Sequence, residues 1–85
     1  MTRPQAQLLV RTLKKRFGGT AEYEAVNGKG RYRFAITSKR FERMGHLARQ
    51  DAIWEIVHEI LPRETTLDVS LILAFAPSEL LVSKE

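Results

Sequence analysis

The chain has 85 residues, a net charge of +4 and no cysteine. The lack of cysteine excludes disulfides, thiolate nucleophiles and cysteine-ligated metal sites. No apolar run reaches the roughly 18 residues that a membrane-spanning helix needs. The length predicts a single domain, residues 1–85. No signal-peptide pattern opens the sequence, so a cytoplasmic protein is expected.

Charge is unevenly distributed along the chain. Residues 1–49 hold 12 Lys or Arg and 3 Glu, whereas residues 50–85 hold 2 Lys or Arg and 7 Asp or Glu. Such separation can create a basic face that meets nucleic acid or an acidic protein. The alternative is a solvated surface on which the two signs neutralise each other.

The first predicted element is a helix that starts after Thr2 and ends at Gly18. Thr2 and Gln5 have the spacing of a capping box, and Pro4 is tolerated in a first turn. The apolar stripe of this helix consists of Ala6, Leu9, Val10, Leu13 and Phe17. A basic cluster, Arg11 and Lys14 to Arg16, stands near the helix C-terminus, where positive charge suits the helix dipole and aids solubility.

Two alternating segments, residues 20–26 and 31–37, predict a hairpin around Asn27-Gly28. A two-residue loop places Glu24 opposite Arg31 and Glu22 opposite Arg33. A four-residue loop places Glu24 opposite Arg33. Both loops leave the glutamates and arginines on one face and the aromatic residues on the other, because the registers differ by an even number.

Ser38 is placed to cap a short helix over residues 39–44, which Gly45 ends. The expected inward anchors of this region are Phe41, Met44 and Leu47. The basic residues expected to point outward are Lys39, Arg40, Arg43 and Arg49. They form the strongest candidate for contact with an anionic partner.

A longer helix is predicted to start between His46 and Asp51 and to stop at Pro62, with Trp54 stacked on His58. Residues 67–75 then alternate as a strand. Its predicted inner face is Leu67, Val69, Leu71, Leu73 and Phe75, and its outer face includes Asp68, Ser70, Ile72 and Ala74. Pro77 opens a final short helix.

The predicted order is helix, two strands, two helices, strand, helix. It forms an α+β fold with two layers, in which the helices cover one face of a three-stranded mixed sheet. The sequence shows no nucleophile–base pair, no phosphate-cradling glycine loop and no ligand cluster. We therefore expect a protein that is not an enzyme and has no cofactor.

This order resembles the BolA-like family, whose fold is akin to the type II KH domain. Ser38, Phe41, Arg49 and Trp54 stand at the spacings of that family's strand, Ser-x-x-Phe, Arg-His-Arg and helical aromatic. Residues 76–80 resemble its Thr-Pro-x-Glu element. The resemblance covers about residues 4–81 and implies a binding module for iron, redox or stress regulation.

The resemblance also implies a [2Fe–2S] cluster shared with a monothiol glutaredoxin, but the ligand positions depart from the family. Asp68 replaces the family's histidine, and the hairpin loop Asn27–Gly30 offers neither His nor Cys. Gln50 and Asp51 replace the last two residues of Arg-His-Arg. Carboxylate oxygen suits iron–sulfur clusters poorly. We therefore expect no metal site.

Two functions follow from the sequence. The first is a BolA-like binding module that acts through a protein partner, for which a monothiol glutaredoxin is the family's candidate. The alternative is a regulatory nucleic-acid-binding protein that uses the basic strand–turn–helix face, Lys39, Arg40, Arg43 and Arg49. The corresponding loop of KH domains has two glycines, whereas Gly45 is the single glycine here.

Overall fold

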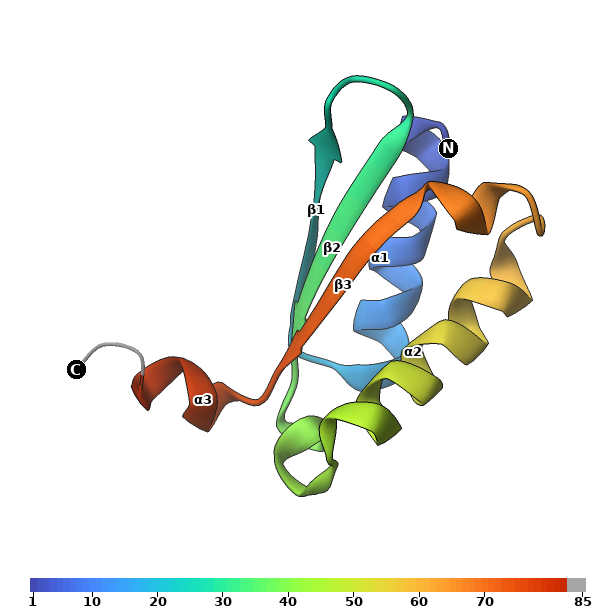
Figure 1. The fold of residues 1–85 in the computed structure, drawn as a ribbon. Helices are drawn as coiled ribbons and strands as arrows, with labels where there is room; N and C mark the ends of the chain where they lie inside the picture. Colours follow the sequence, from blue (N-terminus) through green and yellow to red (C-terminus); the bar gives the residue numbers. More distant parts are fainter. Residues whose placement is uncertain (83–85) are drawn as a thin grey trace.

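A computed structural model describes residues 1–82 of the chain, which form helices, short 3-10 helices and three strands (Figure 1). The elements in chain order are α1 (Arg3–Phe17), β1 (Thr20–Val26), β2 (Arg31–Thr37), η1 (Lys39–Arg43), α2 (His46–Ile60), η2 (Thr65–Asp68), β3 (Val69–Phe75) and α3 (Pro77–Val82). The order predicted from the sequence is confirmed. The short turn η2 was not expected, and β3 begins two residues later than predicted.

The predicted helix boundaries are confirmed by the contacts of their capping residues. Thr2 and Gln5 form both bonds of a capping box, at 2.8 and 3.2 Å. Gly18 ends α1, and its amide donates to the carbonyl of Lys14. Gly19 has a φ of +77°, and a Cβ there would lie 2.0 Å from the Thr37 carbonyl oxygen, so the α1–β1 turn requires glycine.

The three strands lie in the order β1-β2-β3, with an antiparallel β1–β2 hairpin and a parallel β2–β3 pair. The hairpin loop has four residues, and Glu24 pairs with Arg33 through a side-chain hydrogen bond of 2.5 Å. Glu22 faces Ala35, so its expected pairing with an arginine is wrong. Tyr23 contacts the rings of Tyr32 and Phe34 on the other face, as predicted.

The predicted faces of β3 are wrong beyond Val69. Tyr32 pairs with Val69 but Arg33 pairs with Leu71, so Ser70 is an extra residue in the strand. This bulge shifts the two-residue alternation. Ile72 and Ala74 therefore join the core, whereas Leu71 and Leu73 are 47% and 42% exposed on the other face.

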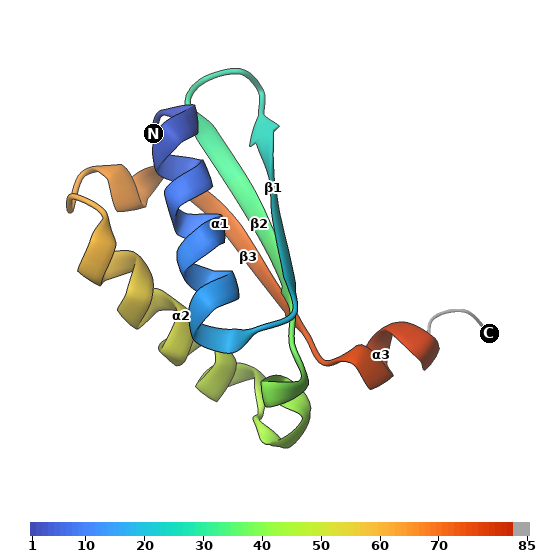
Figure 2. The ribbon, with the colours of Figure 1, turned by 180° about the vertical axis from the view of Figure 1, so that it is seen from behind.

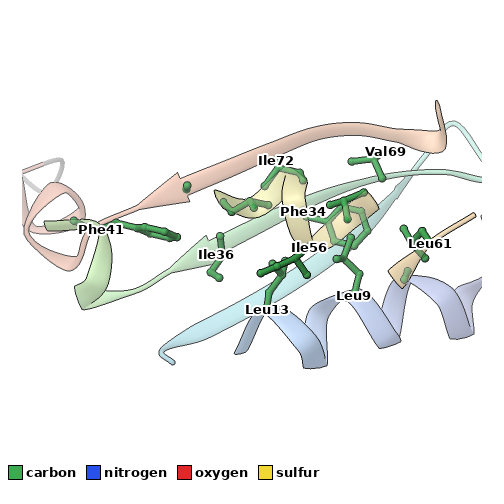
Figure 3. Packing of buried hydrophobic residues seen from close by; sticks show 14 residues of the cluster. Leu9, Leu13, Phe34, Ile36, Phe41, Ile56, Leu61, Val69 and Ile72 are labelled. Carbon is green, nitrogen blue, oxygen red and sulfur yellow. The ribbon is translucent and has the colours of Figure 1, made fainter. Parts of the chain in front are cut away.

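Helices α1 and α2 cover the same face of the sheet, and the opposite face is not covered by any described element (Figures 1 and 2). Figure 3 shows the core between these layers, where Leu9 and Leu13 of α1 and Ile56 of α2 meet Phe34 and Ile36 of β2. The two-layer prediction holds for α1 and α2, but α3 projects past the end of the sheet. No helix among residues 1–82 has the length and apolar character to cross a membrane.

Candidate functional site

The turn η1 is held firmly by the residues that flank and anchor it. Ser38 is buried, accepts a hydrogen bond from the Arg40 amide and donates one of 2.6 Å to the Phe17 carbonyl oxygen. Phe41 is fully buried, and its ring lies 5.1 Å from that of Phe17. With Phe41 turned inward, the remaining side chains of this single turn face solvent, and Lys39, Arg40 and Arg43 are exposed as predicted.

None of these three cations has a carboxylate partner in the part of the chain that the structure describes. Among residues 1–82, no ion pair involves Lys39, Arg40 or Arg43. The acidic residue of the same turn, Glu42, accepts hydrogen bonds from the backbone amide and the hydroxyl of Ser78, at 3.2 and 2.7 Å. Its charge is therefore directed to the first turn of α3, and η1 presents a local excess of positive charge.

The last turn of α1, which is joined to η1 through Phe17, carries two further exposed cations. The Ser38–Phe17 hydrogen bond and the Phe17–Phe41 contact join the end of α1 to η1. Lys14 and Lys15 are exposed on this turn, whereas Arg16 is paired with Glu59 of α2. We call Lys14, Lys15, Lys39, Arg40 and Arg43 the basic end surface. The sequence predicts only helix capping and solubility for the two lysines, because the contact between the end of α1 and η1 depends on tertiary packing.

Arg49 does not belong to this surface, so its predicted outward position is wrong. It is 4% exposed. Its guanidinium donates to both carboxylate oxygens of Glu79, at 2.8 and 2.9 Å, and to the carbonyls of Phe41, Met44 and Ala74. Arg49 precedes Ile53 by four residues, so it lies on the apolar stripe of α2. That spacing could have placed it inside.

The Arg49–Glu79 pair connects α2, η1, the end of β3 and α3. Hydrogen bonding to Arg49, followed by the Ala76 amide, lowers the pKa of Glu79 to about 2 from an ordinary value of 4.5. The hydrogen bonds that Arg49 donates to Glu79 also raise the pKa of Arg49. These hydrogen bonds thus favour the ionised carboxylate of Glu79 and the protonated guanidinium of Arg49. Its role is to fix the frame on which η1 is presented.

This pair predicts a loss of stability in acid. An unfolded chain takes up a proton on Glu79 near pH 4.5, but the folded chain does so only near pH 2. In that interval the unfolded state binds more protons, so the pair's contribution is lost as pH falls through it. The urea midpoint of Glu79→Gln should change less than that of the wild type between about pH 5 and pH 2.5. Equal changes in both proteins would contradict this role.

Trp54 and His58 are in contact, as their spacing predicts, with ring centroids 5.7 Å apart, but the rings are tilted by 40° and not stacked. The indole N–H of Trp54 donates to Gln50, whose amide donates in turn to the carbonyl of Ile72. The surroundings of this pair contain no ligand cluster in the described chain. The arrangement joins α2 to β3.

The two positions at which the resemblance places cluster ligands do lie close together. The amino nitrogen of Met1 forms an ion pair with Asp68 and donates to the carbonyl of Gly30 in the hairpin loop. The site is thus assembled, but its side chains offer one carboxylate and no imidazole or thiolate. Residues 1–82 contain no group of three potential metal ligands. These residues do not fit a [2Fe–2S] cluster.

Reconstitution of the protein with iron, sulfide and a monothiol glutaredoxin should therefore leave no cluster held by this chain. The physical reason is that Asp68 and Asn27–Gly30 supply neither of the ligand types that such clusters prefer. Visible absorption of the purified complex provides the measurement. A stable charge-transfer band that Asp68→Ala abolishes would contradict the prediction.

The comparisons with known proteins concern the fold. No family model and no curated protein sequence matches the chain. A search of solved structures finds similarity to BolA1 from Arabidopsis thaliana, with a TM-score of 0.67 and 20% sequence identity. The match covers 88% of this chain and 94% of that one. The α+β architecture, its element order and this structural match together show that the chain has a BolA-like fold.

Proposed function

We propose that this chain is a non-enzymatic binding module whose basic end surface binds the phosphate backbone of nucleic acid. The observation that supports this function is the exposure of Lys39, Arg40 and Arg43 on a rigid turn with no ion-pair partner among residues 1–82. Lys14 and Lys15 extend the same charge onto α1. Unpaired cations of this kind release counterions from a nucleic acid when they meet its phosphates.

The arrangement favours backbone contact over base recognition. Base reading in the major groove needs a helix or strand that enters the groove with side chains aimed at base edges. The five-residue turn η1 is short, and its one aromatic side chain, Phe41, is buried in the core. It cannot stack on a base as the aromatics of single-strand binders do. Binding should therefore show little sequence preference.

The salt dependence of binding tests this function. A labelled oligonucleotide of generic sequence, single- or double-stranded, should bind the wild type at low ionic strength in a fluorescence anisotropy assay. Three phosphate contacts predict a slope of about −2.7 in log K against log salt for duplex DNA. Absence of binding at low salt, or binding with no salt dependence, would contradict the proposed function.

Protein binding is the second candidate, and it is favoured by the apolar surface on the uncovered face of the sheet. Leu71 and Leu73 are partly exposed there, opposite Arg33 and Ala35 of β2. Contiguous exposed apolar surface is a common feature of protein-binding sites. The resemblance to BolA-like proteins suggests a monothiol glutaredoxin as partner. Calorimetric titration with such a glutaredoxin, compared between wild type and Leu73→Glu, tests this candidate. Equal heats of binding for the two proteins would contradict it.

A further inference from the structure

The two edges of the sheet differ, and the β3 edge is closed. The carbonyl of Phe75 accepts a hydrogen bond from Ser38, at the end of β2, so the carbonyls of alternate residues point away from β2. The carbonyls that point away from β2 are those of Ile72 and Ala74. The Gln50 side chain donates to the Ile72 carbonyl at 2.9 Å, and the Arg49 side chain donates to the Ala74 carbonyl at 3.2 Å. Side chains from the start of α2 thus occupy the positions that an added strand would need.

The β1 edge is open. Strand β1 pairs with β2 on one side, and no described element lies beyond it on the other side in either view (Figures 1 and 2). None of the backbone hydrogen bonds outside the helices and strands of residues 1–82 involves β1. Every second amide and carbonyl of an edge strand points away from its neighbour. Seven residues without proline therefore present a template for another strand.

The charge on β1 is acidic. Glu22 and Glu24 are exposed on the uncovered face, and β1 itself contains no basic residue. Glu24 is paired with Arg33, whereas Glu22 faces Ala35 and forms no ion pair among residues 1–82. The surface beside them is hollowed, with a volume of about 570 Å³ reaching Leu73. A long basic side chain opposite Glu22 would have room and a charge partner.

Self-association through this edge is disfavoured in the register centred on Tyr23. Two copies of β1 paired antiparallel about Tyr23 would set Glu22 of one copy against Glu24 of the other, twice. Like charges directly opposite across strands are destabilising. The acidic edge thus discriminates against a second copy and in favour of a basic strand, which is how specificity arises from repulsion as well as attraction.

We propose that the β1 edge binds an extended segment of a partner protein by strand addition, with a basic residue of that segment facing Glu22. Main-chain hydrogen bonds supply the affinity in this mode, and alternate side chains supply the specificity. The inference rests on the second candidate function, protein binding. It does not depend on nucleic-acid binding, because the basic end surface lies on other elements.

A titration of the isotopically labelled protein with capped seven-residue peptides tests the inference. The probe alternates lysine and valine, one matched peptide replaces each lysine with glutamate, and another carries N-methyl groups on alternate amides. The lysine peptide should shift the amide resonances of residues 20–26 and slow their hydrogen exchange. The glutamate peptide and the N-methylated peptide should bind more weakly, because one lacks the charge match and the other lacks the donors.

Charge variants complete the test. Glu22→Lys should lower the affinity for the lysine peptide about fivefold, because one cross-strand attraction becomes a repulsion. The same substitution should raise the affinity for the glutamate peptide. Glu55→Lys makes the same charge change at an exposed position on α2 and should leave both affinities unchanged. The inference would be overturned if the lysine peptide shifted resonances only outside β1, or if both variants lost the same affinity for it. A dimer paired through β1 in the absence of peptide would also overturn it. Defined peptides keep this result separate from failure of glutaredoxin binding.

Discussion

Arg49→Ala is expected to lower the free energy of unfolding by about 3 kcal/mol, because it removes a buried guanidinium that donates to four groups around it. Glu79 loses its principal partner, and three carbonyl groups in the surrounding elements lose a charged donor. Urea unfolding at neutral pH, followed by circular dichroism, measures the loss.

Arg16→Ala is the matched control for this variant. Arg16 also forms an ion pair with a glutamate, Glu59, but both side chains are about half exposed, at 49% and 54%. Exposed pairs contribute roughly 0–1 kcal/mol. Equal destabilisation by the two substitutions would show that burial of Arg49 does not carry the effect, and would contradict the role assigned to the Arg49–Glu79 pair.

The second large effect concerns the basic end surface. Arg40→Ala combined with Arg43→Ala should reduce the salt slope of nucleic-acid binding by roughly two units. If the two proteins bind equally at 1 M salt, that slope difference corresponds to about a 400-fold loss of affinity at 50 mM salt. Anisotropy at several salt concentrations measures both quantities. Both side chains are exposed, so stability should change little.

Arg3→Ala combined with Arg63→Ala removes the same net charge from exposed positions outside η1. This control should keep most of the wild-type affinity if binding is localised to the basic end surface. A similar loss in both double variants would indicate attraction by net charge alone, and the proposed interface would then be wrong.

Local sequence signals predicted most of the fold. The capping box at Thr2, the glycine after α1, the Asn27-Gly28 turn and the Ser38 cap each act within a few residues, so their effects can be read without knowledge of the tertiary structure. The hairpin shows the boundary of this approach. The Asn27-Gly28 signal fits a loop of two or of four residues, and both lengths keep the same residues on each face.

The predictions from the sequence are wrong where one extra residue shifts the two-residue alternation of a strand, or where the contacting residues are distant in sequence. The bulge at Ser70 moved Leu71 and Leu73 to the uncovered face, and strict alternation cannot reveal it. The prediction that Leu47 is an inward anchor is wrong, because Leu47 precedes Ile53 by six residues, lies off the buried side of α2 and is 76% exposed. Arg49 was misplaced because its partner Glu79 lies 30 residues away.

The central claim is that nucleic acid binds at the basic end surface, and chemical-shift mapping tests it most directly. The isotopically labelled protein would be titrated with a short generic oligonucleotide at low salt. Binding at the basic end surface should give shifts that are concentrated in residues 14–18 and 38–44 and that disappear as the salt concentration is raised. Shifts concentrated on β1 or on the exposed leucines of β3, or no shifts at low salt, would contradict it.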